Sequence, residues 1–93
     1  GALNDINRAV ILDRNNAQLW AEKANVHLRV GQNDEAIKAA DIAIQLDSEY
    51  ASPYLVKGLA QCQSGNKAEG IQNLQKAKSL GDTQADEFIA KFK

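Results

Sequence analysis

The chain has 93 residues, with 11 Lys and Arg against 12 Asp and Glu and a formal net charge of −1. This balance argues against a dedicated nucleic-acid-binding protein, because phosphate contacts require a clustered basic surplus. No apolar run approaches the ~20 residues that span a bilayer, so we expect no membrane insertion. The single cysteine, Cys62, cannot form an internal disulfide and indicates no redox compartment. Length and composition therefore predict one small globular domain, or a piece of a larger protein, and do not indicate its function.

The sequence repeats itself, and this repeat predicts the fold. Residues 17–50 align with 51–84 without a gap and give seven identical pairs, where unrelated segments would share roughly two. The pairs are Ala17/Ala51, Lys23/Lys57, Gly31/Gly65, Glu35/Glu69, Ile37/Ile71, Ala43/Ala77 and Leu46/Leu80. We call the displacement that carries Ala17 onto Ala51 the repeat shift. We therefore expect a single repeat domain over 1–93, composed of the second helix of a partial unit in 1–16, full units in 17–50 and 51–84, and a closing helix in 85–93.

The first segment, 1–16, is expected to leave one apolar face without a partner. A lone second helix lacks the first helix against which it would pack, so Leu3, Ile6 and Val10 would remain uncovered. Such a face favours stacking on another copy of the chain or on further repeats.

The first full unit is expected to divide into two helices at Gly31. An apolar stripe at helical spacing predicts a helix in 17–30, formed by Trp20, Ala24, His27 and Leu28. Gly31 can adopt the left-handed conformation that ends a helix without steric cost, and Gly65 has the same place in the next unit. Asn33 is expected to cap the helix that follows Gly31.

The second full unit and the closing helix follow the same plan. Ser52 is expected to be the N-cap of a helix with Pro53 at its first position, where the missing N–H costs nothing. Gly81 is expected to end the helix over 67–80. Thr83 and Asp86 have the spacing of a weak capping box for the closing helix.

These elements predict six helices of roughly 10–14 residues, joined by short turns, and no strand. The fold class is therefore all-α, an α-solenoid of helix–turn–helix hairpins. The alternative is an ordinary helical bundle whose halves look alike by chance, but a bundle has no reason to keep a constant repeat period.

The repeated unit resembles the tetratricopeptide repeat, whose pattern is W-x2-L-G-x2-Y…A-x3-F…P. In the first full unit the matching positions are Trp20, Ala24, Gly31, Ala36 and Ala43, with His27 in place of the usual tyrosine. In the second unit they are Tyr54, Gly58, Gly65, Gly70, Leu74 and Ala77. The chain departs from the pattern at Lys23, Lys57, Ser48, Asp82 and Ala40. The resemblance covers essentially the whole chain and implies a solenoid that binds other proteins.

Nothing in the sequence predicts catalysis, a cofactor or a metal site. His27 stands where the repeat usually buries an aromatic residue, so we expect it to be packed. Cys62 has no neighbour in the sequence to lower its pKa and is expected to be a small helix residue. Metal-ligand spacings and phosphate-binding glycine loops do not occur. We therefore expect a protein that is not an enzyme and needs no cofactor.

The resemblance implies that the first helix of each unit lines the concave side of the solenoid, where a protein or peptide partner would bind. The candidate peptide-binding residues on that side are Gln18, Asn25, Leu28, Arg29, Leu55, Val56, Leu59, Gln63 and Ile89, and Glu22 lies on the same side. Leu55, Val56 and Leu59 lack an obvious internal partner, which is typical of an interaction surface. Two explanations stay open, since the closing helix or a second copy could equally cover them. The cluster suggests a preference for apolar peptides.

Some members of the family hold the terminal carboxylate of chaperone tails with two Asn and several Lys or Arg at fixed places. Only Asn25 stands at one of these places. The others are occupied by Ala21, Val56, Asp86 and Ala90. We therefore expect this clamp to be absent.

Two functions follow from the sequence. The first is a protein- or peptide-binding adaptor module, and the alternative is a structural segment of a larger repeat protein that self-associates, as a homo-oligomer, through its open N-terminal helix. The identity of a partner cannot be read from the residues.

Overall fold

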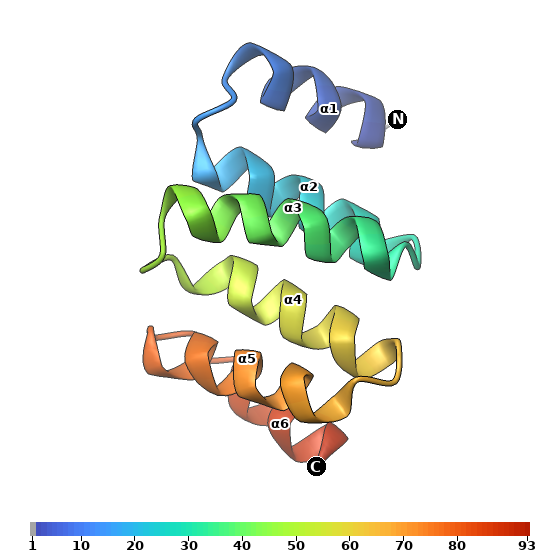
Figure 1. Cartoon of the computed structure of the whole chain (residues 1–93), viewed down its shortest axis with the longest axis vertical. Helices are drawn as coiled ribbons and strands as arrows, with labels where there is room; N and C mark the ends of the chain where they lie inside the picture. The colour runs from blue at the N-terminus through green and yellow to red at the C-terminus, as the bar shows by residue number, and fades with distance from the viewer. Residues whose placement is uncertain (1) are drawn as a thin grey trace.

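The computed structural model describes residues 2–93, so Gly1 lies outside the described residues. Six helices account for most of this range, and none of its residues is in a β-strand. The helices are α1 (Ala2–Leu12), α2 (Ala17–Arg29), α3 (Asn33–Leu46), α4 (Ala51–Gln63), α5 (Lys67–Ser79) and α6 (Ala85–Phe92) (Figure 1). The predicted all-α helical-repeat fold is confirmed. No helix in the described range is both long and apolar enough to cross a membrane.

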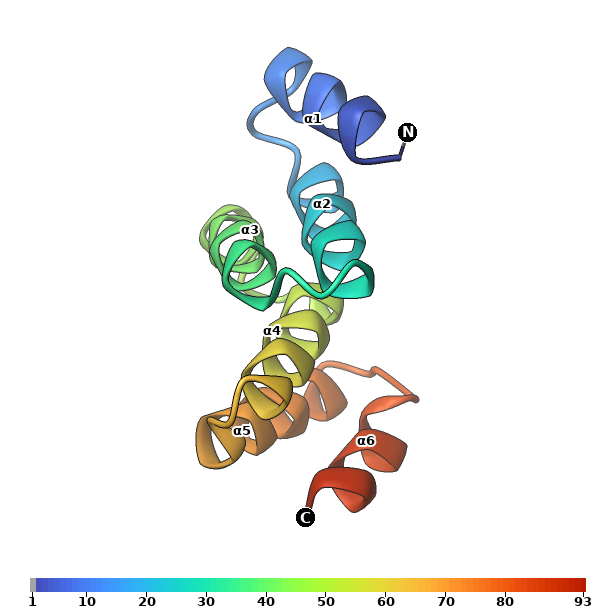
Figure 2. The same ribbon diagram turned by 90° about the vertical axis from the view of Figure 1, so that its right-hand side faces the viewer.

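The helices are stacked in chain order into an elongated molecule of 38 × 25 × 18 Å. Figure 2 shows α2, α4 and α6 on one side and α3 and α5 on the other, with α1 at the end beside α2. Each helix packs against the next, and further contacts join α2 to α4 and α4 to α6. Among the described helices, α1 packs against α2 alone. The layer formed by α2, α4 and α6 therefore carries the helices on which the candidate residues lie.

The turns within the two hairpins repeat at the predicted interval. Gly31 and Gly65 have φ angles of 83° and 96°, which is the left-handed conformation expected of them. The amide of Gly31 donates to the carbonyl of Leu28, and the amide of Gly65 donates to that of Cys62. Helices α2 and α4 thus end in the same hydrogen-bonded turn, at positions related by the repeat shift.

The loops that enter α2 and α4 are held by equivalent aromatic donors. Trp20 Nε1 donates to the carbonyl oxygen of Arg14 at 2.7 Å, and the Tyr54 hydroxyl donates to that of Ser48 at 3.0 Å. The next equivalent position is Phe88, which has no polar atom to donate. The loop before α6 is accordingly different, and Gly81 there has a φ of 104°.

Alanine and glycine dominate the buried contacts, which lets the helices approach closely. One buried cluster joins α2, α3 and α4 and consists of Ala24, Ala36, Ala39, Ala40, Val56 and Ala60, with Trp20, Leu28 and Ile37 packed against it. A second joins α4, α5 and α6 and consists of Leu55, Leu74, Ala77 and Ala85, with Tyr54, Leu59, Cys62, Phe88, Ile89 and Phe92 packed against it.

The predicted N-caps of α3 and α4 are wrong by one or two residues. Asn33 is the first residue of α3, and Gln32 precedes it as the cap. Helix α4 begins before Ser52, and its cap is Tyr50. Pro53 therefore lies further into the first turn, where its missing N–H still removes no intrahelical hydrogen bond.

The predicted capping box before α6 is also wrong. The side chain of Asp82, rather than Thr83, accepts a hydrogen bond there, from the N–H of Gln84 at 2.8 Å. A side-chain cap that the sequence reading missed occurs instead at α2, where Asn16 Oδ1 accepts from the N–H of Gln18 at 3.0 Å.

The expectation of an uncovered apolar face on α1 is wrong for two of its three residues. Ile6 and Val10 are buried, since they face α2, and Leu3 is half-buried. The apolar side chains that α1 leaves exposed are instead Ile11 and Leu12, with 63% and 87% of their surface accessible.

Candidate protein-binding surface

The apolar candidate residues on α4 are used by the fold. Leu55 and Val56 are buried, with 9% and 4% of their surface exposed, so the expectation that they form an open apolar patch is wrong. Leu55 belongs to the cluster that α6 closes, and Val56 belongs to the one between α2 and α4. The physical reason is that α6 folds back over Leu55, as the closing-helix explanation required, whereas α2 covers Val56. Leu59, which is half-buried, packs against the same cluster as Leu55.

The remaining candidates divide by polarity. Leu28 and Ile89 are half-buried and pack against the two core clusters. Gln18, Arg29 and Gln63 are exposed, so the fully exposed members of the candidate set are polar, and Asn25 is half-buried like Leu28 and Ile89. Of these, Asn25 and Arg29 line a common pocket, while Gln18 and Gln63 do not.

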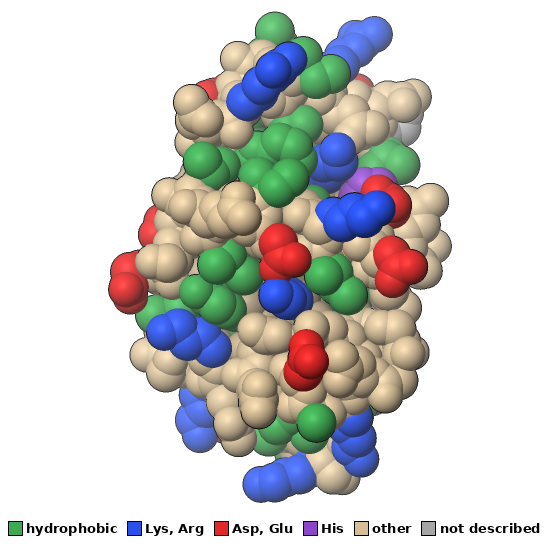
Figure 3. Space-filling view, in the orientation of Figure 1, with side chains coloured by type: hydrophobic (Ala, Val, Ile, Leu, Met, Phe, Trp, Pro, Cys, Tyr) green, Lys and Arg blue, Asp and Glu red, His purple; other side chains and the backbone are tan. Residues whose placement is uncertain are grey.

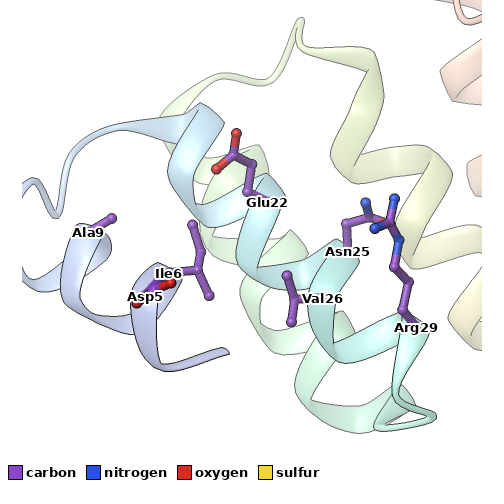
Figure 4. Close-up of a pocket in the computed structure, with 7 residues that line it drawn as sticks. All are labelled: Asp5, Ile6, Ala9, Glu22, Asn25, Val26 and Arg29. Carbon is purple, nitrogen blue, oxygen red and sulfur yellow. The ribbon is translucent and has the colours of Figure 1, made fainter. Parts of the chain in front are cut away.

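This pocket, which we call the α1–α2 pocket, has a volume of about 450 Å³. Its walls are Asp5, Ile6 and Ala9 from α1 and Glu22, Asn25, Val26 and Arg29 from α2 (Figure 4). The floor is apolar, because Ile6 is buried and Ala9 and Val26 are half-buried. The rim is polar and open, since Asp5, Glu22 and Arg29 are exposed.

The charged groups on the rim form no ion pair with another residue in the described range 2–93. The ion pairs of the described residues are Lys38–Glu35, Lys57–Asp41 and Lys78–Asp86, and none of them includes Asp5, Glu22 or Arg29. An apolar floor bordered by two carboxylates and one guanidinium is suited to binding an amphipathic segment of another molecule.

Sequence reasoning missed four residues of the pocket: Asp5, Ile6, Ala9 and Val26. The candidate set contained only the first helix of each unit, whereas the wall that completes this pocket comes from α1. The repeat shift could have identified them, because it assigns each of these positions an equivalent at the α3–α4 contact.

The face of the molecule that α3 and α5 form carries charges of both signs. Figure 3 shows this face, with α3 and α5 in front, and basic and acidic side chains are interspersed over it. The Lys57–Asp41 pair, with Nζ and Oδ1 2.6 Å apart, is one of the contacts that neutralise it.

His27 and Cys62 are the side chains best suited to catalytic chemistry, but both are packed within the fold. His27 is buried, as predicted, and its Nδ1 lies 2.6 Å from Gln32 Oε1. Burial raises the pKa of the Cys62 thiol, and this effect outweighs the opposing one of Lys67. Cys62 is therefore less ionised at neutral pH than an ordinary thiol. Within residues 2–93, no group of His, Cys, Asp or Glu is arranged to hold a metal ion.

Comparison with known proteins connects this architecture to a family of repeats. No protein-family model matches the chain. The TPR repeat-containing thioredoxin TDX of Arabidopsis thaliana is 33% identical over 79 residues, which are 85% of this chain and 21% of that protein. The chain spans between 8% and 25% of the length of the curated relatives it matches.

Two solved structures have the same arrangement of helices. The first TPR of Spaghetti (RPAP3), bound to the HSP90 peptide SRMEEVD, has a TM-score of 0.89 and 17% identity, covering 97% of this chain and 73% of that one, which shows a common fold. The second TPR domain of human RPAP3, in complex with the HSP70 peptide SGPTIEEVD, has a TM-score of 0.87 and 28% identity, covering 97% and 77%.

Proposed function

Because the chain belongs to the tetratricopeptide repeat family, we propose that it is a non-enzymatic module that binds a segment of a partner protein in the α1–α2 pocket and along the adjoining surface of α2 and α4. The observation that carries this proposal is the unused polar rim. Asp5, Glu22 and Arg29 surround an apolar floor without pairing to any described residue. A fold that needed these charges for its own stability would pair or bury them.

A non-enzymatic role also fits the chemistry of the chain. One relative is a thioredoxin by name, but the alignment covers 21% of it. Dithiol exchange requires two cysteines, and these 93 residues contain one. That cysteine has a raised pKa, which opposes nucleophilic chemistry.

The partner segment is expected to differ from the acidic peptides bound by the two RPAP3 domains. Of the positions that hold a chaperone-tail carboxylate in the family, Ala21 and Val56 are buried here, and Asp86 is paired with Lys78 at 2.8 Å. Two carboxylates, Asp5 and Glu22, stand at the pocket that Asn25 lines. We expect repulsion of acidic tails and attraction of a segment that carries a cation.

The preference for apolar peptides that the sequence suggested does not follow from the structure. Leu55 and Val56, on which it depended, lie inside the fold. The accessible groups suit a segment with a short apolar stripe and flanking charges.

A peptide-display selection tests the proposal. Random peptides of about four helical turns in length would be selected against the wild-type chain and then measured against Glu22→Lys, Arg29→Glu and a matched control, Glu87→Lys, at an exposed position of α6. We expect selected peptides to be enriched in Lys and Arg, and to lose about tenfold or more in affinity with the two pocket variants only. Enrichment of EEVD-like tails, or equal binding to all variants, would contradict the proposal.

The second candidate function, self-association, is favoured by one observation. Ile11 and Leu12 at the end of α1 are largely exposed, and an exposed apolar pair is a point at which a second copy could pack. Sedimentation velocity over a range of concentrations separates the two functions. A dimer that is lost in Ile11→Asp/Leu12→Asp would support self-association, and a monomer at every concentration would exclude it.

A further inference from the structure

The internal repeat gives the α1–α2 pocket an equivalent place elsewhere in the same chain. The repeat shift moves every residue of its walls onto α3 or α4, and four of the equivalents lie in the buried cluster between these helices. The equivalent pairs are Asp5/Ala39, Ile6/Ala40, Ala9/Ala43, Glu22/Val56, Asn25/Leu59, Val26/Ala60 and Arg29/Gln63.

At that equivalent place the surface is covered by a helix, α2. Ala39 and Ala40 of α3 and Val56 and Ala60 of α4 form one buried cluster with Ala24 of α2. Trp20 and Leu28, one turn to either side of Ala24 on α2, pack against the same cluster.

The difference in burial follows from this cover. Ala39, Ala43 and Ala60 have 2% or less of their surface exposed. Of their equivalents in the pocket, Asp5 is exposed and Ala9 and Val26 are half-buried. The α1–α2 pocket thus has the shape of a helix-binding position at which the described residues place no helix.

We propose that the α1–α2 pocket binds an amphipathic α-helix of a partner protein, which lies against α1 and α2 as α2 lies against α3 and α4. This inference rests on the proposed function, and it adds that the bound segment is helical rather than extended. The helix would present apolar side chains at i, i+4 and i+8, the spacing at which Trp20, Ala24 and Leu28 fill the equivalent place.

The residues that differ between the two places define the chemistry of this helix. Ile6 replaces Ala40 on the floor, so the central residue of the stripe has to be as small as Ala or Gly. Glu22 and Asp5 replace Val56 and Ala39, so one flank of the helix should carry Lys or Arg. Arg29 lies two helical turns after Glu22, about 10 Å along α2, so an acidic residue is expected about two turns from that cation.

The charged rim also indicates a separable partner. A helix that is permanently packed within the fold meets alanine and valine at these positions, as α2 does. An apolar centre with a charged border is the composition of interfaces that form and dissociate.

Three peptides of equal length test the proposal. The first is a stapled helix of about four turns with Leu, Ala and Leu at i, i+4 and i+8, Lys on one flank and Glu two turns later. The second exchanges the Lys and the Glu, and the third is unstapled and has two central prolines, which prevent a helix. Affinity would be measured by fluorescence anisotropy, and the location by amide chemical shifts.

Two variants and a control locate the binding. Ala9→Trp fills the floor, Glu22→Lys reverses part of the rim, and Ala90→Trp, at an exposed position of α6, is the matched control for a bulky addition. We expect the first peptide to bind the wild type at least about tenfold more tightly than the other two. Ala9→Trp should abolish this binding, Glu22→Lys should favour the second peptide, and Ala90→Trp should change nothing. Circular dichroism checks that each variant is folded. If Ala9→Trp does not fold, Glu22→Lys still tests the proposal.

Each other outcome overturns the proposal in a distinct way. Equal binding of the proline peptide would mean that the pocket accepts an extended segment, which contradicts the helix and leaves the proposed function intact. Binding of none of the three, together with display peptides that ignore Glu22 and Arg29, would overturn both. A concentration-dependent dimer of the chain alone that Ala9→Trp abolishes would show that a second copy, rather than a partner, occupies the pocket.

Discussion

Asn7 and Asp41 stand at equivalent positions, related by the repeat shift. Of these two residues, Asp41 forms an ion pair and Asn7 cannot. Asp41 binds Lys57 with Oδ1 and Nζ 2.6 Å apart, which joins α3 to α4. At the α1–α2 contact, Asn7 Oδ1 is buried and has no hydrogen-bond partner among the described residues, and Lys23 lies over the Trp20 ring, 5.2 Å from its centroid. Since the two contacts are equivalent, we expect Asn7→Asp to draw Lys23 into the same ion pair.

The expected result is a gain of about 0.5–1 kcal/mol in the free energy of unfolding of Asn7→Asp, and a similar loss in Asp41→Asn. Urea unfolding at low and high salt measures both, and the gain should shrink as salt screens the pair. A gain that is insensitive to salt would contradict an ion pair, and no gain would show that the two contacts are not equivalent.

At the scale of residues, the sequence predicts what depends on local spacing. The burial of His27 and the left-handed Gly31 both follow from the position of each residue within one unit. Burial of Leu55 and Val56 does not, because it depends on where α6 and α2 cross α4. The candidate site was accordingly predictable at Asn25 and Arg29, and wrong wherever another helix decides exposure.

At the scale of helices, α4 and α5 approach so closely that two glycines meet. A methyl group at Gly70 would lie 2.5 Å from Cys62 Sγ and 2.8 Å from the carbonyl oxygen of Gly58. The first hairpin has Ala36 and Ala24 at the equivalent places, so the second hairpin is the tighter of the two. Because one of the obstructing atoms belongs to the backbone, a side-chain movement cannot relieve the contact.

We therefore expect Gly70→Ala to destabilise the fold by about 1–3 kcal/mol through overpacking. Helix propensity alone has the opposite sign, since alanine in a helix is favoured over glycine by about 1 kcal/mol. Thermal and urea unfolding decide between them, and a Gly70→Ala variant more stable than the wild type would contradict the close approach. Ala68→Gly, at an exposed position of α5, gives the propensity contribution separately.

Helix positions were predictable to within a few residues because the repeat period is set by the whole unit, while helix starts are set by loop contacts. Tyr50 precedes α4 where Ser52 was expected, in a loop whose conformation is fixed by the bond from Tyr54 to the carbonyl of Ser48. Capping preference is worth about 1 kcal/mol, so a competing loop contact is sufficient to shift the start.

At the scale of the molecule, the chain is a linear stack in which each helix contacts near neighbours in sequence. We propose that its units are a second helix in 1–16, full repeats in 17–50 and 51–84, and a closing helix in 85–93. Recurrence of the Gly31 turn at Gly65 supports this division. In such a stack, stability is approximately the sum of units and nearest-neighbour contacts.

The position of α1 at the end of the stack predicts how fast its amide hydrogens exchange. Because α1 packs against α2 alone, whereas α4 contacts α2, α3, α5 and α6, amide hydrogens of α1 should exchange fastest among the helices and those of α4 slowest. α1 also forms one wall of the α1–α2 pocket, so a bound helix would add the second contact surface that α1 lacks. Hydrogen exchange followed by mass spectrometry, with and without the stapled peptide, should therefore show slower exchange in residues 2–12 on binding and little change in α6. Protection that is uniform along the free chain, or that rises in α6 instead, would contradict a linear stack whose first helix completes the binding position.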